Sequence, residues 1–333
     1  MILPYLKSYF QDKELKLIVK SVLGTDNPEI IQALLERAVT ENLQSFIAKL
    51  LFVESSIGVV FGLLLANNQS IVLKVYSPKI KLSYLEKMHE IQNIFYDEGF
   101  PAPKVITPLF KLGRTHAGFY QLITGQKADA HRPEIRSELA KYLAQFSAIV
   151  DKHRLSPMEN FLQQGGHRKL WPIPHKPLFD FRKTMRGAGW IAKRAQAAKK
   201  ILMAAKVEKK LAHTDWGTKN ALFQNDKLVG IFDWDSLGAM SELQMLGQAA
   251  AQFTADWDSG NKVTPTPEEG RQFVALYQEF RKKTFTPDEY KIISAAADYL
   301  IAIIARFEHA GSNPTIHPYQ DLLKSGEGTS FLF

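Results

Sequence analysis

Residues 213–220 read HTDWGTKN, and residues 231–235 read IFDWD. The residues between them, ALFQNDKLVG, together with the apolar start of the second string, predict one short β-hairpin. Its turn falls at Asn225-Asp226, a pair of residue types that tolerate the backbone of a tight turn. The two strings therefore flank a hairpin, and a hairpin brings its two ends together.

Three polar side chains are expected to meet at the ends of this hairpin. Asp215 and Asn220 lie five residues apart in one loop, and Asp233 should return beside Asn220. Hard oxygen ligands of this kind suit a Mg²⁺ ion that also holds phosphate oxygens. In phosphoryl transfer, one acid positions the attacking hydroxyl while an asparagine and a second aspartate hold metal on the phosphates. A polar turn next to a capped hairpin is the plain structural alternative.

Phosphoryl transfer also needs a cation on the phosphates of the donor, and Lys74 is the candidate. It ends the strand-like string SIVLK, which resembles the Val-Ala-Ile-Lys string of kinases. A lysine on a strand needs a carboxylate to hold it. Glu86 and Glu90 lie one turn apart on one face of the next predicted helix, and either could form the pair.

The first half of the chain predicts helices followed by a small sheet. Asn27-Pro28-Glu29 has the signature of a helix start. From Leu50 to Tyr76 the sequence is rich in apolar residues and favours strand, turn, strand, turn and strand. A helix is predicted over 83–97, and a further strand over 117–123.

The second half predicts a larger helical region. Helical periodicity runs over 135–150 and over 184–205, with weak points at Gly187 and Gly189. Capping boxes at Thr266 and Thr286 announce two late helices. Prolines at 172, 174 and 177 predict a loop between these regions.

Composition sets the outer limits. The chain has 333 residues and 37.7 kDa, a length that fits two lobes, and it contains no cysteine, which excludes disulfides and thiolate chemistry. The N-terminus lacks the layout of a signal peptide, no apolar run is long enough to cross a bilayer, and a cytoplasmic location is expected. The formal charge is +8, but residues 235–333 hold thirteen acids and eight bases, so the positive excess lies before them.

At these motifs the sequence resembles a known family. HTDWGTKN and IFDWD are similar to the His-x-Asp-x-x-x-x-Asn and Ile-Asp-Trp strings of the aminoglycoside phosphotransferase/choline kinase family, which is related to the protein kinases. GFPAPKVI resembles the Gly-x-Pro-x-Pro-x-Val segment of that family, and FYQLITGQ resembles its hinge between lobes. The resemblance covers roughly residues 50–250.

The resemblance implies a two-lobed, kinase-like α+β fold. Residues 1–124 would form an N-terminal lobe with leading helices, an antiparallel sheet and one helix, and residues 125–333 a mainly helical C-terminal lobe, with the hinge near 121–125. The implied activity is transfer of the γ-phosphoryl group of ATP to a hydroxyl of a small molecule, with Mg²⁺. ATP rather than GTP follows from the family.

The resemblance also implies roles for single residues of the C-terminal lobe. Asp215 would be the catalytic aspartate, and His213 would shape the loop. Asn220 and Asp233 would be the magnesium ligands.

In the N-terminal lobe, Lys74 would be the lysine on the phosphates. Glu90 would be its partner by spacing, with Glu86 in reserve. Backbone groups from Gln121 to Ile123 would receive the adenine.

The chain departs from the family pattern in two places. No Gly-x-Gly-x-x-Gly occurs; Ser56, Gly58 and Gly62 stand where a phosphate-binding loop is expected. Met240-Ser241-Glu242 stands where the family often has Gly-Asp-Pro, which predicts altered packing or altered substrate contacts there and not lost metal binding.

The acceptor is left open by the sequence. Asp256-Trp257-Asp258 combines carboxylates with an aromatic ring and would suit an amine-bearing acceptor. The basic segment 167–169 would instead suit an anionic one. The oligomeric state is also open.

Two other classes of function compete with the kinase. A catalytically weak, nucleotide-binding pseudokinase or regulatory module would keep the motifs without turnover. A nucleic-acid-binding protein would fit the pI of about 9.3, but no nucleic-acid motif supports it, and neither nucleic acid nor membrane is an expected partner.

Overall fold

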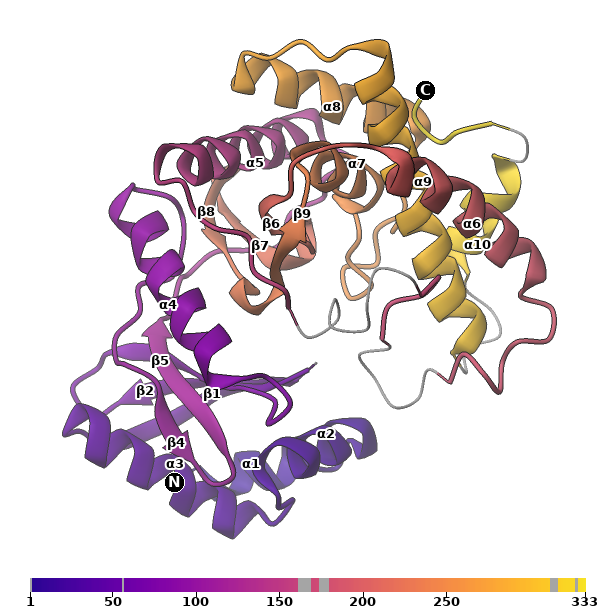
Figure 1. Cartoon of the computed structure of the whole chain (residues 1–333). Helices are drawn as coiled ribbons and strands as arrows, with labels where there is room; N and C mark the ends of the chain where they lie inside the picture. The colour runs from indigo at the N-terminus through magenta and orange to yellow at the C-terminus, as the bar shows by residue number, and fades with distance from the viewer. Residues whose placement is uncertain (1, 56, 161–168, 174–179, 312–316, 327–328) are drawn as a thin grey trace. The chain divides into compact units, whose positions relative to one another are not determined.

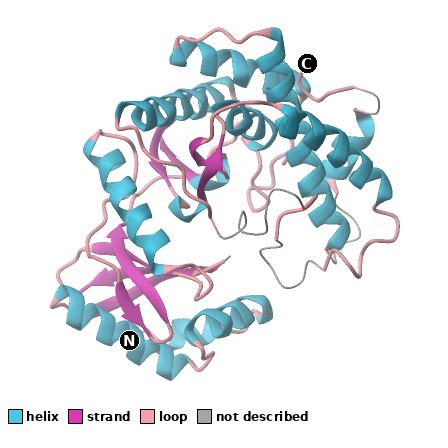
Figure 2. Ribbon diagram, in the orientation of Figure 1, coloured by secondary structure: helices cyan, strands magenta, loops and turns pink. Residues whose placement is uncertain are grey.

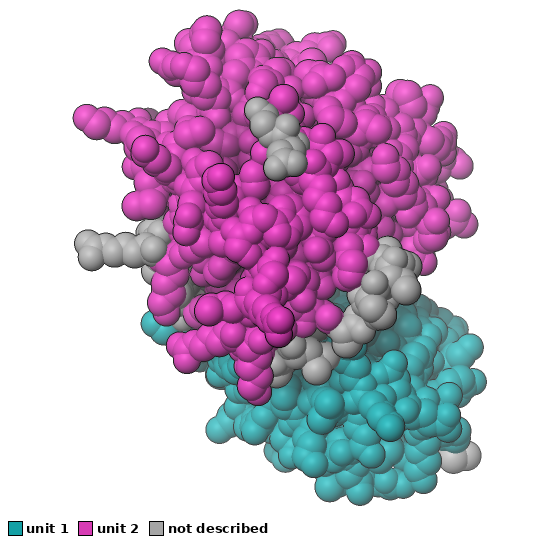
Figure 3. All heavy atoms as spheres, turned by 90° about the vertical axis from the view of Figure 1, so that its right-hand side faces the viewer, with its two compact units in different colours: residues 1–96, 102–123 teal, residues 97–101, 124–333 magenta. Residues whose placement is uncertain are grey.

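The chain forms two compact units in the computed structural model (Figures 1 and 3). Described are residues 2–55, 57–160, 169–173, 180–311, 317–326 and 329–333. The first unit comprises residues 1–96 and 102–123, and the second comprises residues 97–101 and 124–333.

The first unit begins with three helices: α1 (Leu3–Tyr9), α2 (Lys13–Leu23) and α3 (Pro28–Leu43). The predicted start of α3 is confirmed, because the Asn27 side chain accepts hydrogen bonds from the backbone N–H groups of Glu29 and Ile30. This cap satisfies donors that the first helical turn leaves without an intrahelical partner. The apolar sides of the three helices share one core with the sheet that follows.

The sheet of the first unit is antiparallel, with strand order β1-β2-β3-β5-β4 among the described residues (Figure 2). Its strands are β1 (Ile47–Ser55), β2 (Val59–Leu65), β3 (Ser70–Val75), β4 (Phe110–Leu112) and β5 (Thr115–Gln121). Alternate residues such as Phe61, Leu63 and Leu73 are fully buried in the core shared with the helices. The strand period of two leaves the intervening residues, Lys74 among them, on the other face.

Helix α4 (Leu82–Asp97) lies on that other face of the sheet (Figure 1). Its buried side includes Leu85, Met88 and Phe95, which recur at helical spacing. The side chain of Gln92 is buried as well and donates to the carbonyl of Pro103 at 2.6 Å. The helix and the following Gly-x-Pro-x-Pro segment are thus fixed to each other.

The second unit is mainly helical, and α9 packs against α7, α6 and α10. Its helices are α5 (Pro133–Lys152), α6 (Gly189–Ala204), α7 (Glu242–Gln252), α8 (Pro267–Arg281), α9 (Pro287–Ala310) and α10 (Pro318–Ser325). Both predicted capping boxes are present at the starts of α8 and α9. The helix predicted over 184–205 begins only at Gly189, because Gly187 has φ +82° and interrupts the helical backbone.

Two short β-ribbons lie among these helices. One pairs β6 (Lys210–His213) with β9 (Leu237–Met240), and the other pairs β7 (Ala221–Gln224) with β8 (Lys227–Ile231). The second ribbon is the predicted hairpin, and both turn residues, Asn225 and Asp226, have positive φ as expected. Within the described ranges, no helix combines the length and low polarity that a bilayer crossing requires.

Gly247 sets how closely α7 can approach α9. A Cβ atom at this position would lie closer to the carbonyl oxygen of Ile293 than two such atoms can approach, and also against Ala296. The obstacle is backbone, so a side chain at 247 would force the two helices apart.

We expect Gly247→Ala to lower the free energy of unfolding by on the order of 1–3 kcal/mol through overpacking. Gly189→Ala is the matched control, because Gly189 is the first residue of α6 and a Cβ atom there would meet nothing within 4 Å. Thermal unfolding followed by circular dichroism should show a lower Tm for the first variant only. Equal midpoints for the two variants would contradict this account of the helix contact.

Candidate active site

The loop that follows β6 is closed by the backbone of a single residue, Phe232. The carbonyl of Phe232 contacts Nε2 of His213 at 3.0 Å, and its backbone N–H donates to the carbonyl of Asn220 at 2.8 Å. Phe232 directly follows β8. The segment that leaves the hairpin is therefore tied to both ends of the loop from 213 to 220.

His213 is an internal support of this loop. Its side chain is buried, and burial lowers the pKa of its imidazole, so that the ring is neutral. Because Nε2 faces a carbonyl oxygen, Nε2 carries the proton. Edge-to-face contacts with Phe146, Trp216 and Trp234 surround the ring. Among the described residues, Nδ1 finds no hydrogen-bond partner.

The other side of the loop is fixed to the end of α7. The backbone N–H of Thr218 donates to the carbonyl of Phe253 at 2.9 Å. A Cβ atom on Gly217 would lie 2.9 Å from the carbonyl oxygen of Gln252, so this close approach favours glycine. Residues Thr218–Asn220 then form a short 3₁₀ turn that carries the asparagine.

Asp215 and Asn220 are in direct contact. The amide nitrogen Nδ2 of Asn220 donates to the backbone carbonyl of Asp215 at 2.8 Å and to its Oδ2 at 3.1 Å. Because Nδ2 is directed at Asp215, the amide oxygen Oδ1 is the atom that can serve as a ligand. Lys219, for which the sequence motifs predict no role, places Nζ 2.7 Å from Oδ1 of Asp215.

Asp233 stands one residue beyond the closing hydrogen bond at Phe232. Its backbone is in the left-handed region, with φ 61° and ψ 45°, a conformation that costs a non-glycine residue on the order of 1–2 kcal/mol. Ser236 donates its hydroxyl to Oδ2 of Asp233 at 2.9 Å and to its carbonyl at 2.6 Å. Strain held in this way by neighbouring groups is common at functional sites.

The oxygen atoms of this region fit a magnesium ion that is shared with phosphate. Within the described residues, no group of three or more His, Asp or Glu side chains is arranged to hold a metal by itself. The amide oxygen of Asn220 and the carboxylate of Asp233 are hard ligands of the type that Mg²⁺ prefers. Mg²⁺ commonly uses one or two protein carboxylates and completes its shell with phosphate oxygens and water.

Lys74 lies near the end of β3, opposite Val60 on one side and Gly118 on the other. Its ammonium nitrogen is 5.5 Å from the centre of the Tyr76 ring, within cation–π range. The hydroxyl of Tyr76 contacts the hydroxyl of Tyr120, which in turn contacts Nε2 of His89 on α4.

His89 is the residue that α4 turns toward this part of the sheet. A Cβ atom on Gly118 would lie 3.1 Å from the imidazole of His89, so the ring covers the strand beside Lys74. Glu90 instead contacts Lys87 at 2.7 Å, and its side chain is 63% exposed. Glu86 is exposed as well. The pairing of Lys74 with either glutamate stays a prediction.

The apolar periodicity of α4 is the sequence signal that identifies His89 as a residue facing the sheet. His89 lies on the buried side of the helix together with Leu85, Met88 and Gln92, whereas Glu86 and Glu90 are exposed. Burial lowers the pKa of His89 from 6.5 to about 4.

In the segment expected to receive the nucleotide, residues 121–123, one backbone N–H group already has a hydrogen-bond partner within the chain. The N–H of Gln121 donates to the carbonyl of Lys104 at 2.9 Å, and Ile123 follows as a half-buried residue beyond the strand. Ser56 lies outside the described residues. A Cβ atom on Gly58 would lie 2.5 Å from the carbonyl oxygen of Val75, so Gly58 itself packs tightly against the end of β3.

The aromatic-acidic string at 256–258 is only partly directed at solvent. Asp256 is buried, and its Oδ1 accepts the backbone N–H of Asp258, which makes it a turn-forming residue. Trp257 is half exposed. Of the basic string 167–169, residues 167 and 168 lie outside the described part of the chain.

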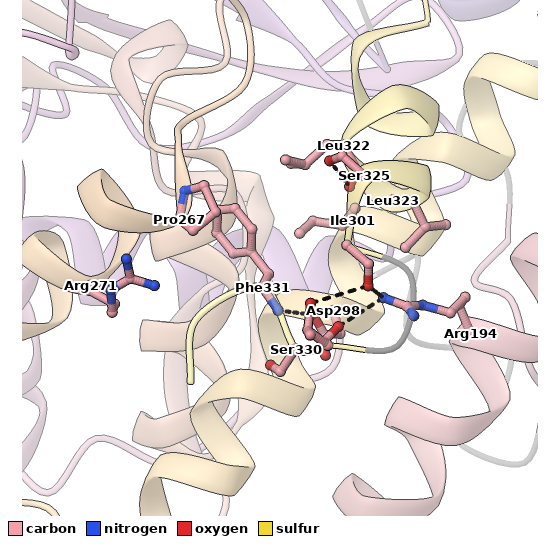
Figure 4. Close-up of a pocket in the computed structure, with 12 residues that line it drawn as sticks. Arg194, Pro267, Arg271, Asp298, Ile301, Leu322, Leu323, Ser325, Ser330 and Phe331 are labelled. Carbon is pink, nitrogen blue, oxygen red and sulfur yellow. Dashed lines mark hydrogen bonds between the residues drawn. The ribbon is translucent and has the colours of Figure 1, made fainter.

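A cavity of about 250 Å³ lies elsewhere in the second unit (Figure 4). The C-terminal residues form part of its wall, where the N–H of Phe331 donates to Asp298 and a guanidinium nitrogen of Arg194 donates to the carbonyls of Gly326 and Thr329. It contains none of the residues that the sequence predicts for the site.

The sheet with its lysine and the helical unit with its hairpin loop together define a kinase-like fold, as predicted from the sequence. The sequence also matches the model of the phosphotransferase enzyme family over residues 60–291, and the chain belongs to that family. No curated protein matches the sequence.

Solved structures similar to this chain include three kinases of small molecules. Amicoumacin kinase hAmiN, in complex with AMP-PNP, Ca²⁺ and Ami, has a TM-score of 0.60 at 12% identity, over 88% of this chain and 91% of that one. A thermostable mutant of aminoglycoside phosphotransferase APH(4)-Ia, with AMP-PNP and hygromycin B, has a TM-score of 0.59 at 14% identity, over 88% and 99%. Plasmodium vivax ethanolamine kinase Pv091845 has a TM-score of 0.55 at 13% identity, over 94% of each chain. At these identities the likeness shows the fold alone.

The depressed pKa of His89 predicts a pH-dependent stability. The unfolded chain binds this proton below about pH 6.5 and the folded chain only below about pH 4, so stability is full above pH 6.5 and falls as the pH drops toward 4. The contribution of this one group amounts to roughly 3 kcal/mol. Tm measured at pH 7.5 and 4.5 should fall less in His89→Gln than in the unaltered protein.

His116→Gln is the control, because His116 is a half-buried histidine of the neighbouring strand. It should keep the full loss of Tm between the two pH values. If His89→Gln and His116→Gln show the same pH dependence, the imidazole of His89 is not the group that destabilises the fold in acid.

Proposed function

We propose that the protein transfers the γ-phosphoryl group of ATP to a hydroxyl group of a small molecule, with Mg²⁺ as the metal. The proposal is supported by membership of the phosphotransferase enzyme family and by the local structure of the candidate site. The single observation that supports the proposal is the closure of the 213–220 loop by Phe232, whose backbone bonds to His213 and Asn220 tie this loop to the residue before Asp233.

The carboxylate of Asp215 is assigned to the acceptor. It would accept a hydrogen bond from the attacking hydroxyl and align the oxygen with the phosphorus, which is the main demand of a dissociative phosphoryl transfer. The contact from Asn220 holds this carboxylate in place.

Asn220 and Asp233 are assigned to the metal, through Oδ1 of the amide and through the carboxylate. When bound, Mg²⁺ would neutralise charge on the phosphate oxygens. Lys74 is assigned to the phosphates of ATP, with its ammonium lying over Tyr76. The backbone near Ile123 is assigned to the adenine, since Gln121 already donates to Lys104.

A weak, nucleotide-binding regulatory module remains the second candidate, because one observation favours it. Both carboxylate oxygens of Asp215 have partners within the chain, Lys219 on Oδ1 and Asn220 on Oδ2. An acceptor hydroxyl must share or displace one of them. Turnover decides between the two candidates. A cytoplasmic location is part of the same proposal, in keeping with the absence of cysteine.

Asp215→Asn should reduce turnover by about 10²–10⁴-fold, because the amide cannot accept the acceptor proton or hold the hydroxyl as a carboxylate does. ADP release is measured over a panel of amino-alcohols, aminoglycosides, sugars and hydroxy acids. Binding of ATP, measured by calorimetry, should change little.

Asp226→Asn is the matched control for this substitution. Asp226 stands at the far end of the same hairpin, where it pairs with Arg132 on the surface and has positive φ that asparagine tolerates. Turnover that survives in Asp215→Asn would remove the catalytic role from Asp215. ATP binding without turnover in the unaltered protein on the entire panel would favour the regulatory module.

Asp233→Asn should raise the Mg²⁺ concentration needed for half-maximal turnover by roughly tenfold or more, since an anionic ligand is lost. The measurement is a Mg²⁺ titration of ADP release at fixed ATP, with Asp226→Asn again as control. An unchanged titration curve would remove Asp233 from the metal site.

A further inference from the structure

Lys219 occupies a position between an acidic and an aromatic group of the second unit. Its Nζ lies 2.7 Å from Oδ1 of Asp215 and 5.6 Å from the centre of the Trp257 ring. The lysine side chain is only 27% exposed. One ammonium group thus contacts the proposed catalytic carboxylate and an indole at the same time.

The indole of Trp257, which contacts this cation, is supported by a second aromatic ring. Trp257 stacks on Tyr319 with ring centres 6.3 Å apart and planes at 28°, and Tyr319 is fully buried. The carboxylate of Glu308 accepts the backbone N–H groups of Tyr319 and Gln320 at the start of α10. Half of Trp257 nevertheless remains exposed, so its ring is a supported surface beside Asp215.

A carboxylate next to an indole is the combination that recognises an ammonium group. An amine-bearing acceptor would need that combination to bring its hydroxyl to Asp215. Here the chain's own ammonium already fills it. A second cation would be repelled by Lys219 and would have to break an ion pair before it could bind.

The neighbouring groups point in the same direction. The ammonium of Lys127 donates to the backbone carbonyl of Lys219, which brings a second positive charge to the loop. Asp256, one of the two acids beside Trp257, is buried and used in a turn. Asp258 is the exposed acid that could still attract an amine.

We propose that Lys219 is a specificity-determining residue: it fills the cation position between Asp215 and Trp257, so that acceptors are neutral or anionic hydroxyl compounds and acceptors with an ammonium group beside the hydroxyl are excluded. The proposal rests on the proposed function for the role of Asp215. It decides between the two acceptor classes that the sequence leaves open.

The direct test is binding of choline, used as a probe cation that carries a hydroxyl, followed by tryptophan fluorescence. Lys219→Met keeps an unbranched side chain that is one atom shorter and removes the charge. We expect this variant to bind choline roughly tenfold or more tightly than the unaltered protein, because the carboxylate and the indole become available. Lys219→Arg keeps the charge and should show no gain.

A double variant locates the gained site. Lys219→Met combined with Trp257→Leu should lose both the fluorescence change and the gained affinity, measured independently by calorimetry. Three results would each overturn the proposal: choline binding in the unaltered protein as tight as in Lys219→Met, no gain in Lys219→Met, or a gain that survives removal of Trp257.

A comparison of acceptors by enzyme kinetics is a second test that does not depend on fluorescence. Glycerol, glycerate and 3-amino-1,2-propanediol differ mainly in charge beside the hydroxyls, and each is also applied as an inhibitor of any acceptor found in the panel. The unaltered protein should engage the amine least, and Lys219→Met should reverse or flatten that order. A preference of the unaltered protein for the amine contradicts the proposal.

The two proposals fail in different ways. Choline binding requires no phosphoryl transfer, so the gain in Lys219→Met can be seen even in a protein without turnover. Loss of the proposed function would appear as turnover that is indifferent to Asp215→Asn. Each result is therefore assigned to one proposal.

Discussion

The peptide groups of Phe232 are the constraint on which the candidate site depends. The N–H of this residue is bonded to Asn220 and its carbonyl to His213, so one residue joins the two ends of the loop that carries Asp215. Each such hydrogen bond contributes only about 1 kcal/mol to stability. Their value lies in geometry, because a loop held at both ends restricts where the backbone of Asp215 can lie. Asp233 follows directly and inherits this position.

The surroundings of the loop explain why the two hydrogen bonds of Phe232 are sufficient to hold it. The imidazole of His213 is enclosed by aromatic rings and is kept neutral by burial, so it acts as a rigid spacer with one donor. Gly217 lets the loop lie against the end of α7, where Thr218 adds a third backbone contact. The left-handed backbone of Asp233 is offset by the hydroxyl of Ser236. The geometry of the candidate site is thus set by groups outside the three predicted site residues, which is how preorganised sites are built.

Local patterns made much of this fold predictable, and tertiary contacts account for the rest. The cap at Asn27, the capping boxes at Thr266 and Thr286 and the turn at Asn225-Asp226 depend on neighbours within a few residues, and all are present. The face that α4 turns to the sheet was not foreseen. A count of residues from Lys74 favoured Glu90, whereas the apolar stripe of the helix places His89 on the sheet. The contact of Lys219 with Trp257 is not predictable from local sequence either, because the two residues are 38 positions apart in the chain.

The ion pair between Lys219 and Asp215 is compatible with catalysis because it is weak. Both side chains are about 30% exposed, and ion pairs in contact with water contribute about 0–1 kcal/mol. A pair of that strength can exchange partners when a hydroxyl or a phosphate arrives, whereas a fully buried pair would resist because each lone charge is costly. An ion pair that a neutral ligand can exchange with is still unfavourable for a second cation. A hydroxyl can share the carboxylate with the lysine, but an ammonium has to displace it from both the carboxylate and the indole. Under the proposed function, the same modest contact would permit turnover and still select among acceptors by charge.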